Sequence, residues 1–134
     1  AIETAMRRGE LLSLTRDTIN LEKKMGFLNE TKNGSSRTVP LTEKAIQTIQ
    51  SLPISFDKKL FPIGKYAFRF HWRKTMKQAN IKDFRFHDLR HEAISQFFEK
   101  GLSIPEVALI SGHKDVRMLF RYTHLKAEDI LRKL

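Results

Sequence analysis

Two residue types that can act on a phosphate ester stand close together in the segment His-Asp-Leu-Arg-His, residues 87–91. On a helix, His87 and Arg90 are three positions apart and share a face. The guanidinium of an arginine stays charged and can give two parallel hydrogen bonds to phosphate oxygens. An imidazole beside it can move a proton at neutral pH. The spacing therefore predicts a site that binds a phosphate group and transfers a proton next to it.

Four further residues could complete such a site. A tyrosine hydroxyl is a weak nucleophile because its pKa is about 10, but neighbouring cations stabilise its anion, which can attack phosphorus. Tyr122 follows His113 by nine residues. Arg7 and Arg8 would point about 100° apart on a helix, so one can face a site and the other solvent. Lys32 stands at the tip of an expected hairpin and could donate a proton to a leaving oxygen. Each of these residues, taken alone, also fits an ordinary structural role.

A metal site is the competing interpretation of the same segment. The spacing of His87, Asp88 and His91 resembles the His-Glu-x-x-His pattern of zinc proteases, with His113 as a third ligand. Asp is shorter than the Glu that must reach a metal-bound water. Arg90 would also place a fixed cation beside the metal. We therefore expect no metal at this site.

The charge distribution favours a polyanionic partner. The 134 residues carry a formal net charge of +10. Residues 58–90 contain ten basic and two acidic side chains, so this stretch alone carries +8. Such a concentration attracts DNA, the commonest polyanion. A membrane surface is the weaker alternative, because no lipid-facing apolar stripe accompanies the basic residues.

The composition also excludes several classes. The chain has no cysteine, which rules out disulfides, thiolate metal sites and cysteine nucleophiles within it. No segment approaches the roughly 20 apolar residues that span a bilayer. A hydrophobic fraction of 40% predicts a folded domain. We expect a single domain in a reducing, cytoplasmic setting.

Hydrophobic patterning predicts a mainly helical α+β fold, with a small three-stranded antiparallel sheet near the N-terminal side packed against a helical bundle. Residues 1–14 have helical composition without a preceding cap. Short strands are expected around 19–21, 26–28 and 37–39, and Asn33-Gly34 is a strong turn signal between the last two. Helices are expected over 42–52, 65–79, 87–99, 103–111, 116–122 and 128–134.

The expected helix at 65–79 has two distinct faces. Phe68, Trp72 and Met76 repeat every four residues, which is typical of core packing. A neighbouring stripe repeats at the same period and is basic throughout. A helix with one basic edge can lie along DNA, so we expect DNA binding by Lys65, Arg69, Arg73 and Lys77.

Five blocks in order resemble the tyrosine recombinase, or phage integrase, family over nearly the whole chain. They are Thr-x-Met-Arg-Arg-Gly-Glu-Leu, then Lys-Asn-Gly leading to Arg-Thr-Val-Pro-Leu, then His-Asp-Leu-Arg-His, then Ser-Gly-His, then Arg-Tyr-Thr-His. No single block is specific, but their order and spacing together are.

The resemblance implies a role for each matching residue. Arg7 and Arg90 would bind the non-bridging oxygens of the scissile phosphate, and Lys32 would protonate the 5′-hydroxyl leaving group. His87 would assist proton transfer with the nucleophile, and His113 would hydrogen-bond the phosphate. Tyr122 would form a 3′-phosphotyrosyl bond. His91 and Glu10 would be supporting residues, and Arg8 and His124 surface or neighbouring groups.

The implied function is site-specific DNA recombination by transesterification, without metal, ATP or any other cofactor. The alternatives are a type IB topoisomerase and a non-catalytic DNA-binding remnant. The implied partner is double-stranded DNA, bound by a homotetramer on paired sites. Family members carry an N-terminal DNA-binding domain, so we expect residues 1–134 to be a catalytic-domain fragment lacking that domain and its own first elements. Alone, the fragment could be monomeric.

Overall fold

The computed structural model describes residues 1–29, 35–124, 127–131 and 134. It confirms the predicted class, mainly helical with a three-stranded antiparallel sheet near the N-terminal side. None of the described helices is both long and apolar enough to cross a membrane. In chain order the described elements are α1 (Arg8–Ser13), the 3₁₀-helix η1 (Arg16–Thr18), β1 (Ile19–Asn20), β2 (Met25–Leu28), β3 (Arg37–Pro40), α2 (Glu43–Ser51), α3 (Lys65–Gln78), α4 (Asp88–Glu99), α5 (Ile104–Ser111), the 3₁₀-helix η2 (Val116–Tyr122) and α6 (Ala127–Leu131).

The sheet has β2 in the middle, with β1 and β3 antiparallel to it on either side. Gly26 pairs with Ile19 on one side and with Val39 on the other. Side chains alternate across a strand, and here Leu28 and Val39 are buried while Phe27 is exposed. The sheet therefore buries one face. The predicted Asn33-Gly34 turn lies outside the described residues.

Local capping explains where the main helices begin and end. Thr42 Oγ1 accepts a hydrogen bond of 3.1 Å from the Ala45 amide at the start of α2, as predicted. Gly101, at φ +89°, ends α4 in the left-handed conformation that favours glycine. Ser103 and Glu106 form a capping box on α5. The segment 116–122 is helical as expected, and its helix is of the 3₁₀ type.

The prediction of a helix from residue 1 is wrong. Residues 1–7 form a turn and a stretch without regular secondary structure, in which Ala5 has a φ of +50°, and α1 begins only at Arg8, with Arg7 as its N-cap. Thr4, Ala5 and Met6 are buried, so this stretch runs through the interior. The Ala5 carbonyl accepts a hydrogen bond from Arg90, which a continuing helix would have used for itself. Helical composition predicts helix formation only weakly, and here tertiary contacts outweigh it.

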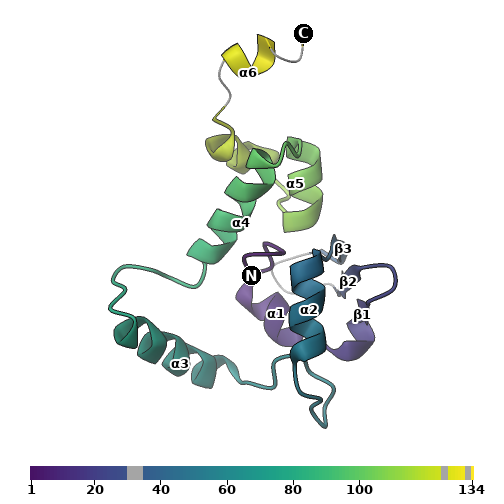
Figure 1. Ribbon diagram of the computed structural model, residues 1–134, viewed down its shortest axis with the longest axis vertical. Helices are drawn as coiled ribbons and strands as arrows, with labels where there is room; N and C mark the ends of the chain where they lie inside the picture. The colour runs from purple at the N-terminus through teal and green to yellow at the C-terminus, as the bar shows by residue number, and fades with distance from the viewer. Residues whose placement is uncertain (30–34, 125–126, 132–133) are drawn as a thin grey trace.

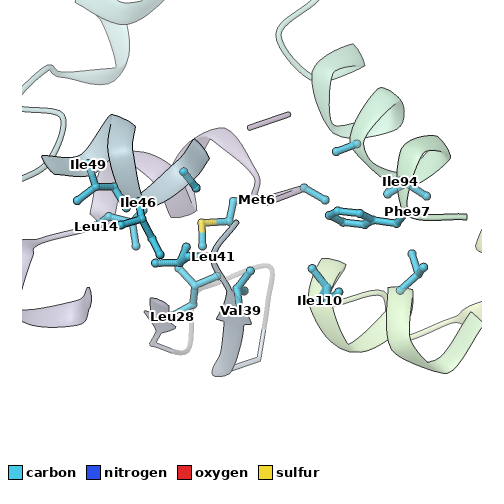
Figure 2. Packing of buried hydrophobic residues seen from close by; sticks show 14 of the residues in the cluster. Met6, Leu14, Leu28, Val39, Leu41, Ile46, Ile49, Ile94, Phe97 and Ile110 are labelled. Carbon is cyan, nitrogen blue, oxygen red and sulfur yellow. The ribbon is translucent and has the colours of Figure 1, made fainter. Parts of the chain in front are cut away.

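One core joins the sheet to the C-terminal helices. Met6 lies near its middle, between α2 and the strands on one side and α4 and α5 on the other (Figure 2). Its largest fully buried side chains come from six separate parts of the chain: Met6, Leu60, Ile94, Leu119, Val39 and Val107. The N-terminal stretch is therefore a structural link, and it holds α4 against the sheet.

Helix α3 stands outside this core. It contributes no buried residue, which corrects the expectation that Phe68, Trp72 and Met76 pack into the core. Instead Phe68 and Trp72 pack edge-on against Phe86, at ring-centroid distances of 4.9 and 5.2 Å. Figure 1 shows α3 set apart from the rest, joined to α2 and α4 by long segments. The aromatic stripe thus packs against the segment just before α4 and not against the core.

Candidate active site

Arg90 is the most deeply placed of the expected site residues. It lies in the first turn of α4 and is 3% exposed. Its Nη1 donates to the Ala5 carbonyl, which fixes the direction of the guanidinium. Burial, and then the nearby charge of Arg7, lower the pKa of Arg90 to about 10. The group stays protonated at neutral pH and offers its remaining N–H donors in a fixed orientation.

Arg7 reaches the same place from the N-cap of α1. Its backbone amide donates to Glu10 Oε2 at 2.7 Å, and its Nη1 donates to Glu10 Oε1 at 3.1 Å. About 31% of its side chain remains exposed, so part of the guanidinium stays available. Arg7 was expected from its place in the family's block, and the expectation that Arg7 and Arg8 point about 100° apart assumed a helix that begins only at Arg8. Arg7 differs from Arg8 because its backbone and side chain are hydrogen-bonded to Glu10.

Glu10 is itself held by a third arginine that the sequence did not single out. Arg37 of β3 donates to both Glu10 oxygens, at 2.7 and 2.9 Å, and its Nε donates to the Ile110 carbonyl at 3.0 Å. Burial raises the pKa of Glu10, but the hydrogen bonds from Arg37 and Arg7 outweigh it, and the pKa is lowered overall. Glu10 therefore stays ionised and links α1, β3 and the end of α5.

His113 sits in the turn that follows α5. Its Nδ1 lies 2.7 Å from Ser111 Oγ and 3.4 Å from Arg90 Nη2. Burial, and then the charges of Arg90 and Arg7, lower the pKa of His113 to about 4. The imidazole is therefore neutral at physiological pH. A neutral ring next to two guanidinium groups can donate a hydrogen bond to a bound anion without adding a charge.

Tyr122 is the last residue of η2 and is half-buried. Its hydroxyl contacts His91 Nδ1, and the two rings stack at 5.9 Å between centroids. Arg121 Nη2 also donates to this hydroxyl at 3.1 Å. The hydroxyl also lies close enough to Arg90 to influence the pKa of that guanidinium, so it belongs to the same cluster. From the sequence, His91 was expected only as a supporting residue and Arg121 was not expected in the site. The usable signal for His91 was its helical spacing from His87.

His87 is close to these groups but does not contact the tyrosine hydroxyl. Its ring lies 4.9 Å from that of His91, and the residue is exposed. Burial, and then the charges of His91, Arg90 and Arg7, lower the pKa of His87. Lys32, the remaining expected site residue, lies outside the described residues.

A cleft of about 1280 Å³ opens between α1 and α3 beside this site. Arg7, Arg8 and His87 are among the residues that line it, as are the aromatic residues Trp72 and Phe86. Three of the four residues of the expected basic stripe also line it, and Lys77 does not: Lys65, Arg69 and Arg73. The cleft therefore joins the candidate catalytic groups to the basic edge of α3.

The arrangement does not match the competing zinc site. Among the described residues, no three His, Asp or Glu side chains are gathered so that they could hold a metal ion. His91 Nδ1 faces Tyr122, and His113 Nδ1 faces Ser111 and Arg90. A tyrosine hydroxyl, two guanidinium groups and three imidazoles near the start of α4, with Arg7 and His87 lining the adjoining cleft, instead suit the cleavage of a phosphate ester through a tyrosine nucleophile.

Comparisons with known proteins agree with this class of site. The sequence profile of the phage integrase family matches residues 1–129. The chain is 47% identical over 135 residues to the shufflon-specific DNA recombinase of Escherichia coli, covering all of this chain and 35% of that protein. It is 30% identical over 131 residues to the tyrosine recombinase XerA of Saccharolobus solfataricus, covering 96% of this chain and 45% of that protein. The chain belongs to the phage integrase family, whose members are tyrosine recombinases.

Solved structures show the same fold. The catalytic domain of bacteriophage HP1 integrase superposes with a TM-score of 0.73 at 25% identity, covering 97% of this chain and 73% of that one. A crystal structure of XerA recombinase gives a TM-score of 0.75 at 22% identity, covering 98% of this chain and 53% of that one. The chain thus spans less than half the length of the two curated relatives, and most of the HP1 catalytic domain.

Proposed function

We propose that this chain provides the catalytic site of a site-specific DNA recombinase that cuts and rejoins DNA through a 3′-phosphotyrosyl intermediate. The observation that carries the proposal is a connected cluster: the Tyr122 hydroxyl contacts His91 of α4, Arg90 of the same helix contacts His113, and Arg7 lines the adjoining basic cleft. A nucleophile and fixed cations at one point are what an attack on a phosphodiester needs.

In this mechanism Tyr122 attacks the scissile phosphorus and the 5′ oxygen leaves. Arg7 and Arg90 bind the non-bridging oxygens, where negative charge grows in the transition state. His113 donates a hydrogen bond to the same phosphate, and His87 takes part in proton transfer. Lys32 protonates the leaving oxygen. The energy of the broken bond is kept in the protein–DNA ester, so the cycle uses neither ATP nor a metal.

We infer that the partner is double-stranded DNA and that the active assembly is a homotetramer on paired sites. Relatives of the same fold support DNA as the partner. The Tn1549 transposon integrase has been solved in complex with a circular intermediate DNA, and it superposes with a TM-score of 0.75. XerH site-specific recombinase has been solved bound to its difH substrate, with a TM-score of 0.69.

The basic edge of α3 is the proposed contact to the DNA backbone. Its four cations are all exposed, and three of them line the cleft. The stretch of residues 58–90 that contains them has only two acidic residues, Asp83 and Asp88, so its net charge is strongly positive. Contacts of this kind supply affinity and register without reading sequence. The four residues are Lys65, Arg69, Arg73 and Lys77.

The decisive experiment is to trap the covalent intermediate. The probe is a pool of nicked DNA duplexes with randomised sequence around the nick, so that a short strand carrying the released 5′-hydroxyl diffuses away. Wild-type protein should become covalently attached to DNA, and the attachment should survive denaturation. Tyr122→Phe should abolish it while DNA binding is retained, because only the nucleophilic oxygen is removed.

Tyr66 provides the matched control, since it is the other tyrosine of the chain and is 82% exposed on α3. Tyr66→Phe should form the covalent complex at the wild-type rate. A complex that persists in Tyr122→Phe, or the absence of any complex with wild-type protein, would refute the proposal. Relaxation of supercoiled DNA without joining between two sites would instead identify a topoisomerase.

A further inference from the structure

The hydroxyl of Tyr122 has two partners among the described residues, His91 Nδ1 and Arg121 Nη2. His87, the histidine whose position in the family pattern implies proton transfer with the nucleophile, is not one of them. It lies one helical turn earlier on α4, with its ring edge against the ring of His91. The two histidines of the His-Asp-Leu-Arg-His segment therefore differ in their contacts: His91 contacts the Tyr122 hydroxyl and His87 does not.

The chemistry of the attack needs a proton acceptor at this hydroxyl. A tyrosine oxygen is a poor nucleophile while it carries its proton, because a phenol ordinarily loses that proton only near pH 10, with a pKa of about 10. Arg121 is a donor only and cannot take the proton. His91 can take it when Nδ1 is unprotonated and Nε2 carries the ring hydrogen. The contact atom in the structure is this same Nδ1.

We propose that His91 is the general base that takes the proton from Tyr122, an assignment that rests on the proposed function. The Tyr122 O–H bond breaks and its proton passes to His91 Nδ1. The oxygen then forms a bond to phosphorus while the bond from phosphorus to the 5′ oxygen breaks, and that oxygen takes a proton from Lys32 in the proposed mechanism. In the rejoining reaction the attacking 5′-hydroxyl returns its proton to Lys32 and His91 returns its proton to Tyr122, so the cycle is balanced.

The surroundings of His91 favour the neutral, proton-accepting state. The titratable and charged groups that face it come from α4, from η2 and from the turn after α5: His87, Asp88, Arg90, His113, Arg121 and Tyr122. Burial, and then the charge of Arg121, lower the pKa of His91 despite the opposing effect of Asp88. The imidazole is therefore unprotonated at neutral pH. Arg121, 3.1 Å from the hydroxyl, would stabilise the phenolate once it forms.

The assignment leaves His87 free for the DNA side of the site. His87 lines the cleft together with Arg7, whereas His91 and Tyr122 are not among the residues that line it. The two histidines would thus act on opposite partners, His91 on the nucleophile and His87 on the bound phosphate or its leaving group. This division can be tested, because the two variants should change different steps.

The test measures single-turnover cleavage of nicked DNA as a function of pH, using duplexes recovered from the covalent pool described above. His91→Gln keeps a side chain that can hydrogen-bond but cannot accept a proton, and His91→Ala removes the group. Both should slow cleavage by about 10²–10⁴-fold at neutral pH, the usual contribution of a general base. Their rates should keep rising above neutral pH, where solvent takes over the deprotonation, whereas the wild-type rate should level off there. DNA affinity should change little.

His124→Ala is the matched control, because His124 is an exposed histidine two residues after the nucleophile. It should keep the wild-type rate and pH profile. Thermal melting of each variant checks folding, and His91→Gln serves if His91→Ala does not fold. A His91→Gln protein whose rate and pH profile match those of wild type overturns the inference. A lower rate with an unchanged profile also overturns it, since that result means His91 only orients the ring.

The outcomes separate this inference from the proposed function. If wild-type protein forms no covalent complex, the recombinase proposal has failed and His91 has no role of this kind. If wild-type protein forms the complex, Tyr122→Phe does not, and His91→Gln behaves as wild type, only the assignment of His91 has failed.

Discussion

The buried carboxylate of Glu10 lies between two arginines and holds the residues of this site in place. Glu10 is 3% exposed and Arg37 is 8% exposed on its side chain, so the pair is shielded from water. Glu10 also holds both the backbone and the side chain of Arg7. Because Arg37 reaches the Ile110 carbonyl with its remaining Nε–H, one ion pair fixes the strand, the start of α1 and the end of α5 together. The direction of Arg7 therefore depends on a residue that need not touch DNA.

Replacing Arg37 by alanine should destabilise the fold by about 3 kcal/mol, since removing one partner of a buried pair leaves an uncompensated charge. Arg7 remains beside Glu10, which keeps the loss at the lower end of the usual range. Urea unfolding at neutral pH measures the change. Lys24→Ala is the control, because the Lys24–Glu43 pair is exposed and should contribute less than about 1 kcal/mol. Equal losses in the two variants would show that the buried network has no special role.

Sequence reasoning found the residues that lie within short motifs and missed the ones that tertiary contacts bring together. Arg90, His113 and Tyr122 were predicted from local blocks, and the structure brings them into one site. No local pattern indicated that Arg37 would pair with Glu10, 27 positions earlier, or bond to Ile110, 73 positions later. Contacts over such separations depend on how whole elements pack, which no local spacing encodes.

At the scale of elements the strongest predictions came from caps and turns. Thr42, Gly101 and Ser103 marked helix ends correctly because each satisfies a backbone requirement within a few residues. The N-terminal stretch failed for the opposite reason. Its composition favours a helix, but burial of Ala5 and Met6 and the bond from Arg90 to the Ala5 carbonyl accompany a non-helical path.

The turn between α5 and η2 requires glycine for two separate reasons. Gly112 has a φ of +71°, and a Cβ there would lie 2.7 Å from Arg37 Nη1. Three hydrogen bonds hold that guanidinium, so it cannot move aside. Gly112→Ala should therefore lose roughly 1–2 kcal/mol of stability to left-handed backbone strain. The close contact with Arg37 should lower the stability further. The substitution should also displace His113, the next residue.

Two other glycines separate these effects in the same unfolding experiment. Gly101 has a φ of +89° with open space around its Cβ position, so Gly101→Ala should show the backbone strain alone. Gly9, inside α1, has neither constraint, and Gly9→Ala should be neutral or slightly stabilising. If Gly112→Ala and Gly101→Ala lose the same stability, the close approach of Arg37 is not a constraint.

At the scale of the whole molecule, stability and charge are located in different places. The core joins the sheet, α2, α4 and α5, whereas α3 buries no side chain and stands apart (Figure 1). The basic stretch of residues 58–90 includes all of α3. Because α3 adds little to the core, its exposed cations can be replaced without unfolding the protein.

This separation gives the last prediction. Replacing the four α3 cations by alanine should leave the urea midpoint unchanged and weaken DNA binding with a smaller dependence on salt. Each phosphate contact contributes about 0.9 to the slope of log affinity against log salt, so the slope should fall by roughly 2–4. Fluorescence anisotropy over a salt series measures it. The variant is Lys65→Ala combined with Arg69→Ala, Arg73→Ala and Lys77→Ala.

The control removes the same charge elsewhere, from four exposed lysines outside α3: Lys23, Lys44, Lys58 and Lys100. If net charge alone attracts DNA, both fourfold variants will lose the same slope, and α3 is then no interface. If the α3 edge contacts phosphates, its variant will lose more slope than the control, because counterions are released only where cations meet the backbone. The difference between the two slopes thus reports how many of these side chains contact DNA.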